Sequence, residues 1–300
     1  LNTEAQFVEI PDTSFRKLLQ SELPRAFNNQ KQLDTSHSSL GYLTYLTCSY
    51  MKIRSIEGIS YLKNLESVDC SNNLIEQLPA LPPKLKRIDI SKNKITRIEA
   101  YPDSLIYLNC YGNKIKQLTG FPGTLKGLDC SVNELKTLGA LPLYLEILDC
   151  SYNQLEQLPA LPDHLTLLNA GNNLLVAVPR LPAKLESLSV QWNRLQALPG
   201  LPGKLTFLHC EKNELSELPD LPNLLNELNC DNNLLRLLPV LPESLRILSC
   251  NYNFITHPPR LPGKLWYFHG IMNCFTSQPE NKHPDILINY MTGNRDDCKK

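Results

Sequence analysis

The sequence has no excess of either charge, because its 30 Lys and Arg residues balance 30 Asp and Glu residues. A chain without net charge has no overall field that attracts nucleic acid or anionic lipid, so we expect neither as a partner. No apolar run approaches the length of a membrane span, so we expect no membrane-spanning segment. No secretory signal peptide is visible. One local basic cluster is either solvated surface or a patch that steers an acidic partner: Lys84, Lys86, Arg87, Lys92, Lys94, Arg97, Lys114 and Lys116.

The sequence also lacks the short motifs that mark common catalytic sites. It contains no phosphate-binding loop, no nucleophile elbow and no Cys-x-x-Cys pair. We therefore expect no enzymatic activity, no catalytic residues, no metal site and no cofactor.

What the sequence does contain is a phrase that recurs every twenty residues, Leu-Pro-x-Leu-Pro-x-x-Leu-x-x-Leu-x-Cys-x-x-Asn-x-Leu-x-x. A fixed period of this length predicts a solenoid, in which each unit buries its apolar face only against its neighbours. The asparagine of the phrase fixes the register at Asn73, Asn93, Asn113, Asn133, Asn153, Asn173, Asn193, Asn213, Asn233, Asn253 and Asn273.

Each repeat is expected to contribute one short strand. Apolar residues alternate around Ile88 and Ile90, which is the period of a half-buried strand. Parallel neighbours lie about 4.8 Å apart, so roughly eleven or twelve strands would form a curved sheet of about 50–55 Å. In this repeat we expect Leu85, Ile88, Ile90, Ile95 and Ile98 to point inward, and Arg87, Asp89 and Ser91 to point outward.

The rest of the repeat is expected to turn and return without a helix. An asparagine after the strand can donate to and accept from backbone groups that the turn leaves unpaired, so its recurrence predicts a buried ladder. The return limb carries Leu-Pro-x-Leu-Pro, as in residues 158–162. Proline fixes φ and removes a donor, which favours an extended, polyproline-like limb.

This pattern resembles the bacterial leucine-rich repeats of the Leu-Pro-x type, which occur in effectors that Gram-negative pathogens inject into host cells. The resemblance covers about residues 65–275. It implies an α/β-type repeat solenoid that is mostly β: a right-handed leucine-rich-repeat horseshoe with a parallel concave sheet and an extended, polyproline-like convex side. It also implies that a bacterium secretes the protein into the host cell cytoplasm.

The ends depart from the period, and we expect an N-terminal helical cap over residues 1–42, a solenoid over 43–275 and a C-terminal cap or tail over 276–300. The first unit, residues 43–64, is two residues longer than the others and resembles the internalin-like bacterial repeat. Pro11 or Asp12 is expected to begin an amphipathic helix that covers the open apolar end of the stack. Residues 284–291 are expected to form a short capping helix.

Seven cysteines share one inward position with Ile90, Ala170 and Val190. Side chains in a parallel ladder fit disulfide geometry poorly, and a line of thiols cannot surround zinc as a tetrahedron. We therefore predict buried, reduced thiols that pack as small apolar groups, which suits a reducing compartment. Cys274 and Cys298 lie outside the stack and receive no assignment. The seven are Cys70, Cys110, Cys130, Cys150, Cys210, Cys230 and Cys250.

One outward column is rich in carboxylates. Neighbours such as Asp129 and Asp149 would lie about 5 Å apart, the separation of a retaining glycosidase pair. The sheet imposes that spacing, so it indicates no chemistry. His209 and His269 are three repeats apart, roughly 14 Å by strand spacing, which is too far to share a metal.

Large apolar side chains recur at other outward positions. Scattered exposed apolar residues are normal, but these share one face and include Trp and Tyr, which are enriched at interface hot spots. We therefore predict a protein-binding site on the concave face, made by Tyr107, Ile147, Tyr152, Leu167, Trp192, Phe207, His209, Glu211, Glu227, Asp231, Ile247, Tyr252 and Tyr267.

The sequence thus favours a monomeric effector that scaffolds or inhibits a partner protein, either a host protein or another secreted bacterial enzyme. Two alternatives stay open. The chain is the substrate-recognition part of a longer bacterial ubiquitin ligase, or it is a bacterial surface adhesin, which the internalin-like first unit favours. Only about 25 residues follow the last repeat, too few for another domain, so we expect no ubiquitin-ligase domain in this chain.

Overall fold

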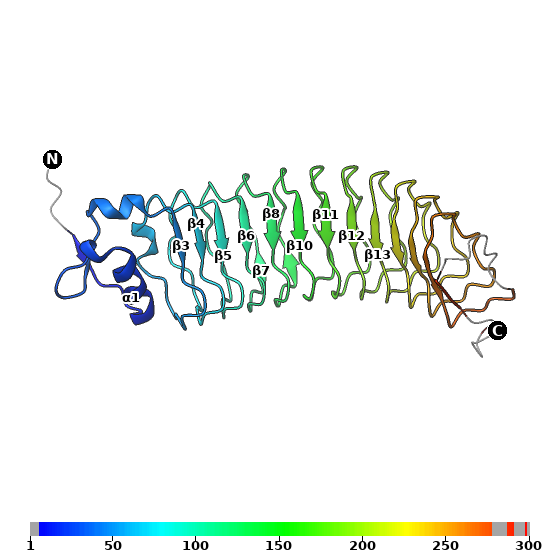
Figure 1. Cartoon of the computed structure of the whole chain (residues 1–300), viewed down its shortest axis with the longest axis horizontal. Helices are drawn as coiled ribbons and strands as arrows, with labels where there is room; N and C mark the ends of the chain where they lie inside the picture. The colour runs from blue at the N-terminus through cyan, green and yellow to red at the C-terminus, as the bar shows by residue number, and fades with distance from the viewer. Residues whose placement is uncertain (1–5, 278–286, 291–297, 299–300) are drawn as a thin grey trace. The chain divides into compact units, whose positions relative to one another are not determined.

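Short parallel strands recur every twenty residues, as the sequence period predicts (Figure 1). The computed structural model describes residues 6–277, 287–290 and 298. These residues belong to two compact units, Leu1–Leu145 and Glu146–Lys300, called unit 1 and unit 2 below. The described residues contain a single α-helix, and no helix among them is long and apolar enough to cross a membrane.

The chain begins with a cap of mixed structure. Helix α1 (Thr13–Glu22) starts where the sequence predicts, because the Asp12 carboxylate accepts a hydrogen bond of 2.9 Å from the Phe15 N–H. The other Asp12 oxygen accepts from the Arg54 N–H at 2.8 Å, which ties the helix to the first repeat. Around it lie β1 (Phe7–Val8), which pairs antiparallel with β2 (Leu33–Asp34), and the 3-10 helices η1 (Pro24–Ala26) and η2 (Ser38–Tyr42).

The sheet of unit 1 is parallel and in register, with one strand from each repeat. Residues twenty positions apart pair, as Arg87 does with Tyr107. In spatial order its strands are β3 (Tyr45–Thr47), β4 (Ser67–Asp69), β5 (Arg87–Asp89), β6 (Tyr107–Asn109) and β8 (Gly127–Asp129).

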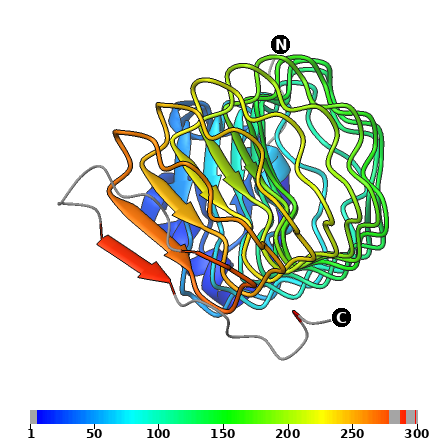
Figure 2. The same ribbon diagram turned by 90° about the vertical axis from the view of Figure 1, so that its right-hand side faces the viewer.

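Unit 2 continues the same pattern, and its strands follow chain order in space. Figure 2 looks along the repeats and shows these strands on one side of the coils, with β17 in red beside β16. The strands are β10 (Ile147–Asp149), β11 (Leu167–Asn169), β12 (Ser187–Ser189), β13 (Phe207–His209), β14 (Glu227–Asn229), β15 (Ile247–Ser249), β16 (Tyr267–Gly270) and β17 (Leu287–Tyr290).

The inward side chains form the core. Leu85, Ile90 and Ile95 are completely buried and Ile88 is nearly so, as predicted. Ile98 is only half-buried, unlike Leu118 and Leu158 at the same position of later repeats. The prediction for Ser91 was wrong. This residue is buried rather than outward, because the chain turns in behind the strand and the Ser91 N–H bonds to the Asp89 carboxylate at 2.9 Å.

The asparagine of each repeat forms the predicted ladder. The Asn213 amide nitrogen donates to the carbonyl of Val190 in the preceding repeat at 3.0 Å and to that of Cys210 at 3.1 Å. Its oxygen accepts from the N–H of Leu195 in the preceding repeat at 3.0 Å. Each asparagine therefore satisfies backbone groups that the turn exposes in its own repeat and in the one before it.

The return limbs are extended and contain no helix in the twenty-residue repeats that the structure describes. Two limbs of unit 1 add short strands, β7 (Gln117–Leu118) and β9 (Thr137–Leu138), which pair in parallel and were not predicted. Thr119 and Gly139 replace the first proline of the limb, so these backbones keep the N–H groups that such pairing needs, and Gly139 N–H bonds to Leu118 at 2.8 Å. The first repeat, residues 43–64, also contains the 3-10 helix η3 (Ile59–Tyr61).

The C-terminal prediction was wrong where the structure tests it. Residues 287–290 form strand β17 rather than part of a helix, and they pair in parallel with β16. The rest of the predicted helix lies outside the described residues. Cys274 and Cys298, which received no assignment, form a disulfide. The horseshoe shape and the domain limits at residues 42 and 275 stay predictions.

Candidate functional site

The first outward position of strands β10 to β16 in unit 2 forms a column of mainly large side chains. Register pairs these residues from strand to strand. Ile147, Leu167 and Phe207 are 43%, 36% and 43% exposed, although they belong to regular strands. In chain order the column is Ile147, Leu167, Ser187, Phe207, Glu227, Ile247 and Tyr267.

The corner that follows each strand adds a second row. Tyr152, Trp192 and Tyr252 are exposed there with φ values of +52°, +54° and +54°. This is the left-handed region, which bulky residues seldom occupy. The same corner carries Asn72, Asn172 and Asn232 in other repeats, with φ near +55°. We call the column and this row of unit 2 together the strand face.

The strand face brings together most of the predicted site. Twelve of the thirteen residues predicted for partner binding lie in unit 2, in its strands or corners: Ile147, Tyr152, Leu167, Trp192, Phe207, His209, Glu211, Glu227, Asp231, Ile247, Tyr252 and Tyr267.

Tyr107 lies in unit 1 and is partly covered by its neighbours. The Arg87 guanidinium lies 4.2 Å from the centre of the Tyr107 ring. The other side of the ring packs where Gly127 has no side chain, because a Cβ at Gly127 would come within 2.6 Å of the ring. Tyr107 therefore packs within its own sheet, and its role in partner binding stays a prediction.

The carboxylates at the third residue of several strands have a structural role. Asp69, Asp89 and Asp129 each accept a hydrogen bond from the backbone N–H two residues later, at 2.9–3.0 Å. Asp149 repeats the contact in unit 2, with Ser151 as donor. These carboxylates cap the turn that leads into the asparagine ladder.

Three other carboxylates gather at β13 and β14. Glu227 lies 2.8 Å from Nε2 of His209, and Asp231 accepts from the Asn251 N–H at 2.6 Å and from the Ser249 hydroxyl at 2.8 Å. Burial raises the pKa of Glu211, and the charges of Asp231 and Glu227 add to the shift. The Oε2 atom of Glu211 is buried and finds no hydrogen-bond donor among the described residues.

A second unpaired acceptor lies on the neighbouring repeat. Gln191 precedes Trp192 as Glu211 precedes Lys212, and its Oε1 atom is also buried without a donor among the described residues. The Gln191 amide occupies the space above Gly171, where a Cβ would come within 2.5–2.7 Å of it. The sequence predicted Glu211 as part of the binding site. The repeat pattern could not predict that Glu211 and Gln191 are partly buried, because their burial depends on side chains of neighbouring repeats.

The ladder cysteines are free and completely buried, as predicted, and Cys48 joins them at the start of the stack. Burial raises the thiol pKa of Cys110, Cys150 and Cys250 far above the ordinary value of 9.0. Such thiols are inert and inaccessible to oxidants. The reduced state of these thiols therefore does not indicate an oxidising or a reducing compartment. Among the described residues, no cluster of side chains is arranged to hold a metal ion.

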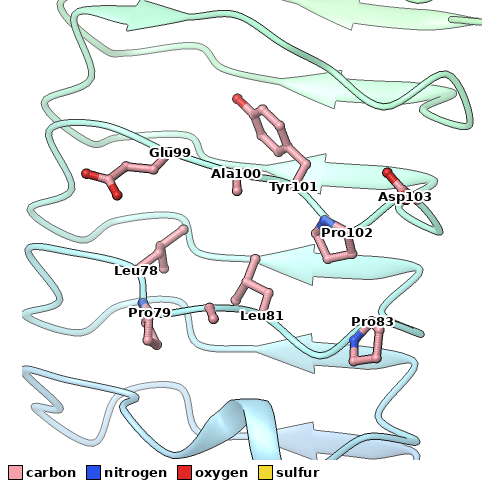
Figure 3. A pocket seen from close by; sticks show the side chains of 10 residues that line it. Leu78, Pro79, Leu81, Pro83, Glu99, Ala100, Tyr101, Pro102 and Asp103 are labelled. Carbon is pink, nitrogen blue, oxygen red and sulfur yellow. The ribbon is translucent and has the colours of Figure 1, made fainter.

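Three cavities among the described residues lie between return limbs. Figure 3 shows one of about 490 Å³, with Leu78 and Leu81 on one limb and Tyr101 and Pro102 on the next. Similar hollows lie between limbs 160–163 and 179–182, and between limbs 238–243 and 259–262. Their recurrence at one place in the repeat makes them a product of limb packing. Tyr101 differs from the leucine of the pattern, and its hydroxyl is buried without a partner in the described chain, which raises its pKa.

Comparison with known proteins agrees with the fold. Residues 43–83 match the family described as Leucine Rich repeats (2 copies). The structure is similar to YopM from Yersinia enterocolitica WA-314, with a TM-score of 0.72 and 30% identity over 85% of this chain, which spans 61% of the length of that protein. A search of curated proteins found no match.

Two further solved structures resemble the chain. One is described as YopM, a leucine-rich effector protein from Yersinia pestis, with a TM-score of 0.62 and 27% identity, covering 95% of this chain and 89% of that one. The other is the functional domain of InlJ from Listeria monocytogenes, whose description includes a cysteine ladder. It has a TM-score of 0.80 at 22% identity and covers 98% of this chain and 72% of that one, a likeness of fold alone. The chain is therefore a mostly-β, parallel solenoid that matches leucine-rich repeats at residues 43–83 and is similar in structure to bacterial leucine-rich-repeat effectors.

Proposed function

We propose that the chain is a protein-binding effector that engages its partner through the strand face of unit 2 and acts by scaffolding or inhibition rather than by catalysis. The partner is a host protein or another secreted bacterial enzyme, met in the host cell cytoplasm after secretion by a bacterium. The effector is monomeric before it binds. The likeness to two YopM structures, one of which is described as an effector, supports this assignment.

One observation carries the proposal: six large apolar side chains are exposed on the strands of unit 2 and in the corners that follow them, outside the core. They are Ile147, Tyr152, Leu167, Trp192, Phe207 and Tyr252. Exposed apolar groups gathered in this way mark interaction surfaces, and aromatic residues are the usual anchors.

The turn carboxylates argue against catalysis at the same face. Asp149 accepts from the Ser151 N–H at 3.0 Å and from its hydroxyl at 2.6 Å, so it caps the turn and is not free to act as an acid or base. A binding surface can act without chemistry of its own by covering another enzyme's active site.

The test is capture of partners from host lysate, and from the secreted proteins of the source bacterium, by the wild-type chain and by a double variant, Trp192→Ala with Phe207→Ala. We expect the variant to lose the captured proteins while its circular dichroism and melting stay near wild type. The control changes two exposed apolar residues of a return limb in unit 2, Leu237→Ala and Val240→Ala. If the control loses capture and the first variant retains it, the strand face is not the binding site.

A further inference from the structure

The carboxylates at β13 and β14 are not part of the repeat pattern. Glu227 occupies the first strand position, where every other repeat from Ser67 to Tyr267 carries a residue that is not acidic. Glu211 and Asp231 occupy the position two residues after the strand, and no other repeat from Ser71 to Ile271 has an acid there. These three acids are therefore particular to two repeats, whereas the turn carboxylates recur along the chain.

Basic side chains do not neutralise this cluster within the outward strand positions. From residue 147 to residue 271, these columns of unit 2 contain no Lys or Arg, and their only imidazoles are His209 and His269. His209 pairs with Glu227. The His269 ring packs against the Tyr267 ring, with 4.2 Å between the ring centres. Asp231 accepts hydrogen bonds from the uncharged side chains of Ser249 and Asn251. The nearby Lys212 lies over the Trp192 ring, 5.1 Å from its centre.

Apolar anchors border the carboxylates directly. Phe207 pairs in register with Glu227, and the Trp192 N–H donates to the Glu211 carbonyl at 2.9 Å. Large aromatic residues therefore belong to the same repeats as the carboxylates or to the repeat next to them. An apolar environment beside a charged pair strengthens a charge-assisted hydrogen bond.

We propose that the strand face at β12 to β14 binds a basic segment of the partner protein, with an arginine or lysine side chain between Glu211, Glu227 and Asp231 and an apolar neighbour on Phe207. The inference rests on the proposed function and names the chemistry of its partner. Charge complementarity is the argument, because an acidic face with unpaired acceptors attracts a cationic donor and repels acidic surfaces. Arginine fits best, since its planar group carries five donors and is weakly hydrated.

The test selects binders from a random dodecapeptide library displayed on phage, with the folded chain as target. We expect the selected peptides to be enriched in Arg or Lys next to an aromatic or aliphatic residue. Their affinity should fall as salt is raised, because salt screens the long-range attraction between the acidic cluster and a basic peptide. A selection that yields neutral or acidic peptides, or no binders, would overturn the proposal.

Two matched variants assign the effect to these carboxylates. We expect Glu211→Gln with Glu227→Gln to weaken the selected peptides by about tenfold or more, the scale for one side of a buried charge pair. The control, Glu217→Gln with Asp220→Asn, removes the same charge from an exposed return limb of unit 2 and should change affinity less than about twofold. Equal losses in both would refute the assignment.

The same peptides separate this inference from the proposed function. Peptides that lack basic residues yet need Trp192 and Phe207 would overturn the basic partner and leave the protein-binding face intact. Peptides that ignore those two residues and need Leu237 and Val240 would overturn both.

Discussion

At the scale of the residue, some left-handed corners carry a bulky side chain at the cost of backbone strain. Trp192 and Val132 both occupy this conformation, at φ of +54° and +53°, although asparagine or glycine fits it with little strain. Strain of this kind persists where the side chain serves another purpose. For Trp192 the strand face supplies that purpose.

Replacing Trp192 with asparagine should therefore stabilise the fold and weaken binding. We expect a gain of about 1 kcal/mol in the free energy of unfolding, the scale of the strain removed, measured by urea denaturation. Val132→Asn relieves the same strain in unit 1 and should leave partner binding unchanged. Trp192→Ala keeps the strained backbone and should bring no gain. A Trp192→Asn variant that is less stable than wild type would contradict the argument.

The half-buried Glu211 predicts a pH dependence of stability. Its pKa in the folded chain is raised above the ordinary 4.5 by burial, so the folded state binds its proton more tightly than the unfolded state does. Stability contributed by this group is therefore lost as pH rises above 4.5. Glu211→Gln should be more stable than wild type at neutral pH, and this advantage should shrink toward pH 4.5. Denaturation across this range, with Glu217→Gln as control, checks the expectation; an advantage that grows on acidification would contradict it.

At the scale of the element, the C-terminal strand depends on a covalent link. The Cys274–Cys298 disulfide joins the last repeat to a residue 24 positions later, beyond β17. A crosslink restricts the unfolded chain, and for a loop of this size the expected stabilisation is about 3 kcal/mol. The buried ladder thiols are already reduced, so a reductant should act on this bond alone among the described cysteines.

We therefore expect dithiothreitol to lower the melting temperature of the wild-type chain and to leave a Cys298→Ser variant unchanged. The variant itself should melt where the reduced wild type does. Calorimetry with and without reductant measures both. A wild-type chain that melts identically in the two conditions would show that the disulfide does not stabilise the fold.

The strands and the asparagine ladder were predictable because both recur at a fixed spacing, so eleven repeats indicate the same register. Strand β17 was not, because residues 287–290 lie outside the period and their structure is set by pairing with β16. The prediction for Ser91 was wrong for another reason. Apolar and polar residues still alternate in the sequence after the strand has ended, so the pattern wrongly places Ser91 on the outside. The apolar part of the strand face was predictable from its column. The unpaired oxygens of Glu211 and Gln191 were not, since packing between repeats buries them.

At the scale of the whole molecule, the period makes the chain tolerant to changes of whole repeats. Deleting residues 176–195 joins Leu175 to Gln196 and keeps every strand and asparagine in phase. Since each repeat contacts only its neighbours, we expect cooperative unfolding with a modestly lower melting temperature. Deleting residues 176–185 places the inward leucines out of phase and should abolish folding. Circular dichroism melting of both variants tests this; cooperative melting of the shorter deletion would refute it.

The asparagine ladder also has a direction, and synthesis on the ribosome gives that direction a meaning. Asn213 completes the backbone of the repeat before it, through Val190 and Leu195, so a coil is satisfied only when the next one has emerged. A growing chain therefore carries one unfinished coil at its exit-side end, and each new asparagine closes the coil made just before it. Loss of repeats from the C-terminal side always uncovers such a coil, whereas loss from the N-terminal side does not.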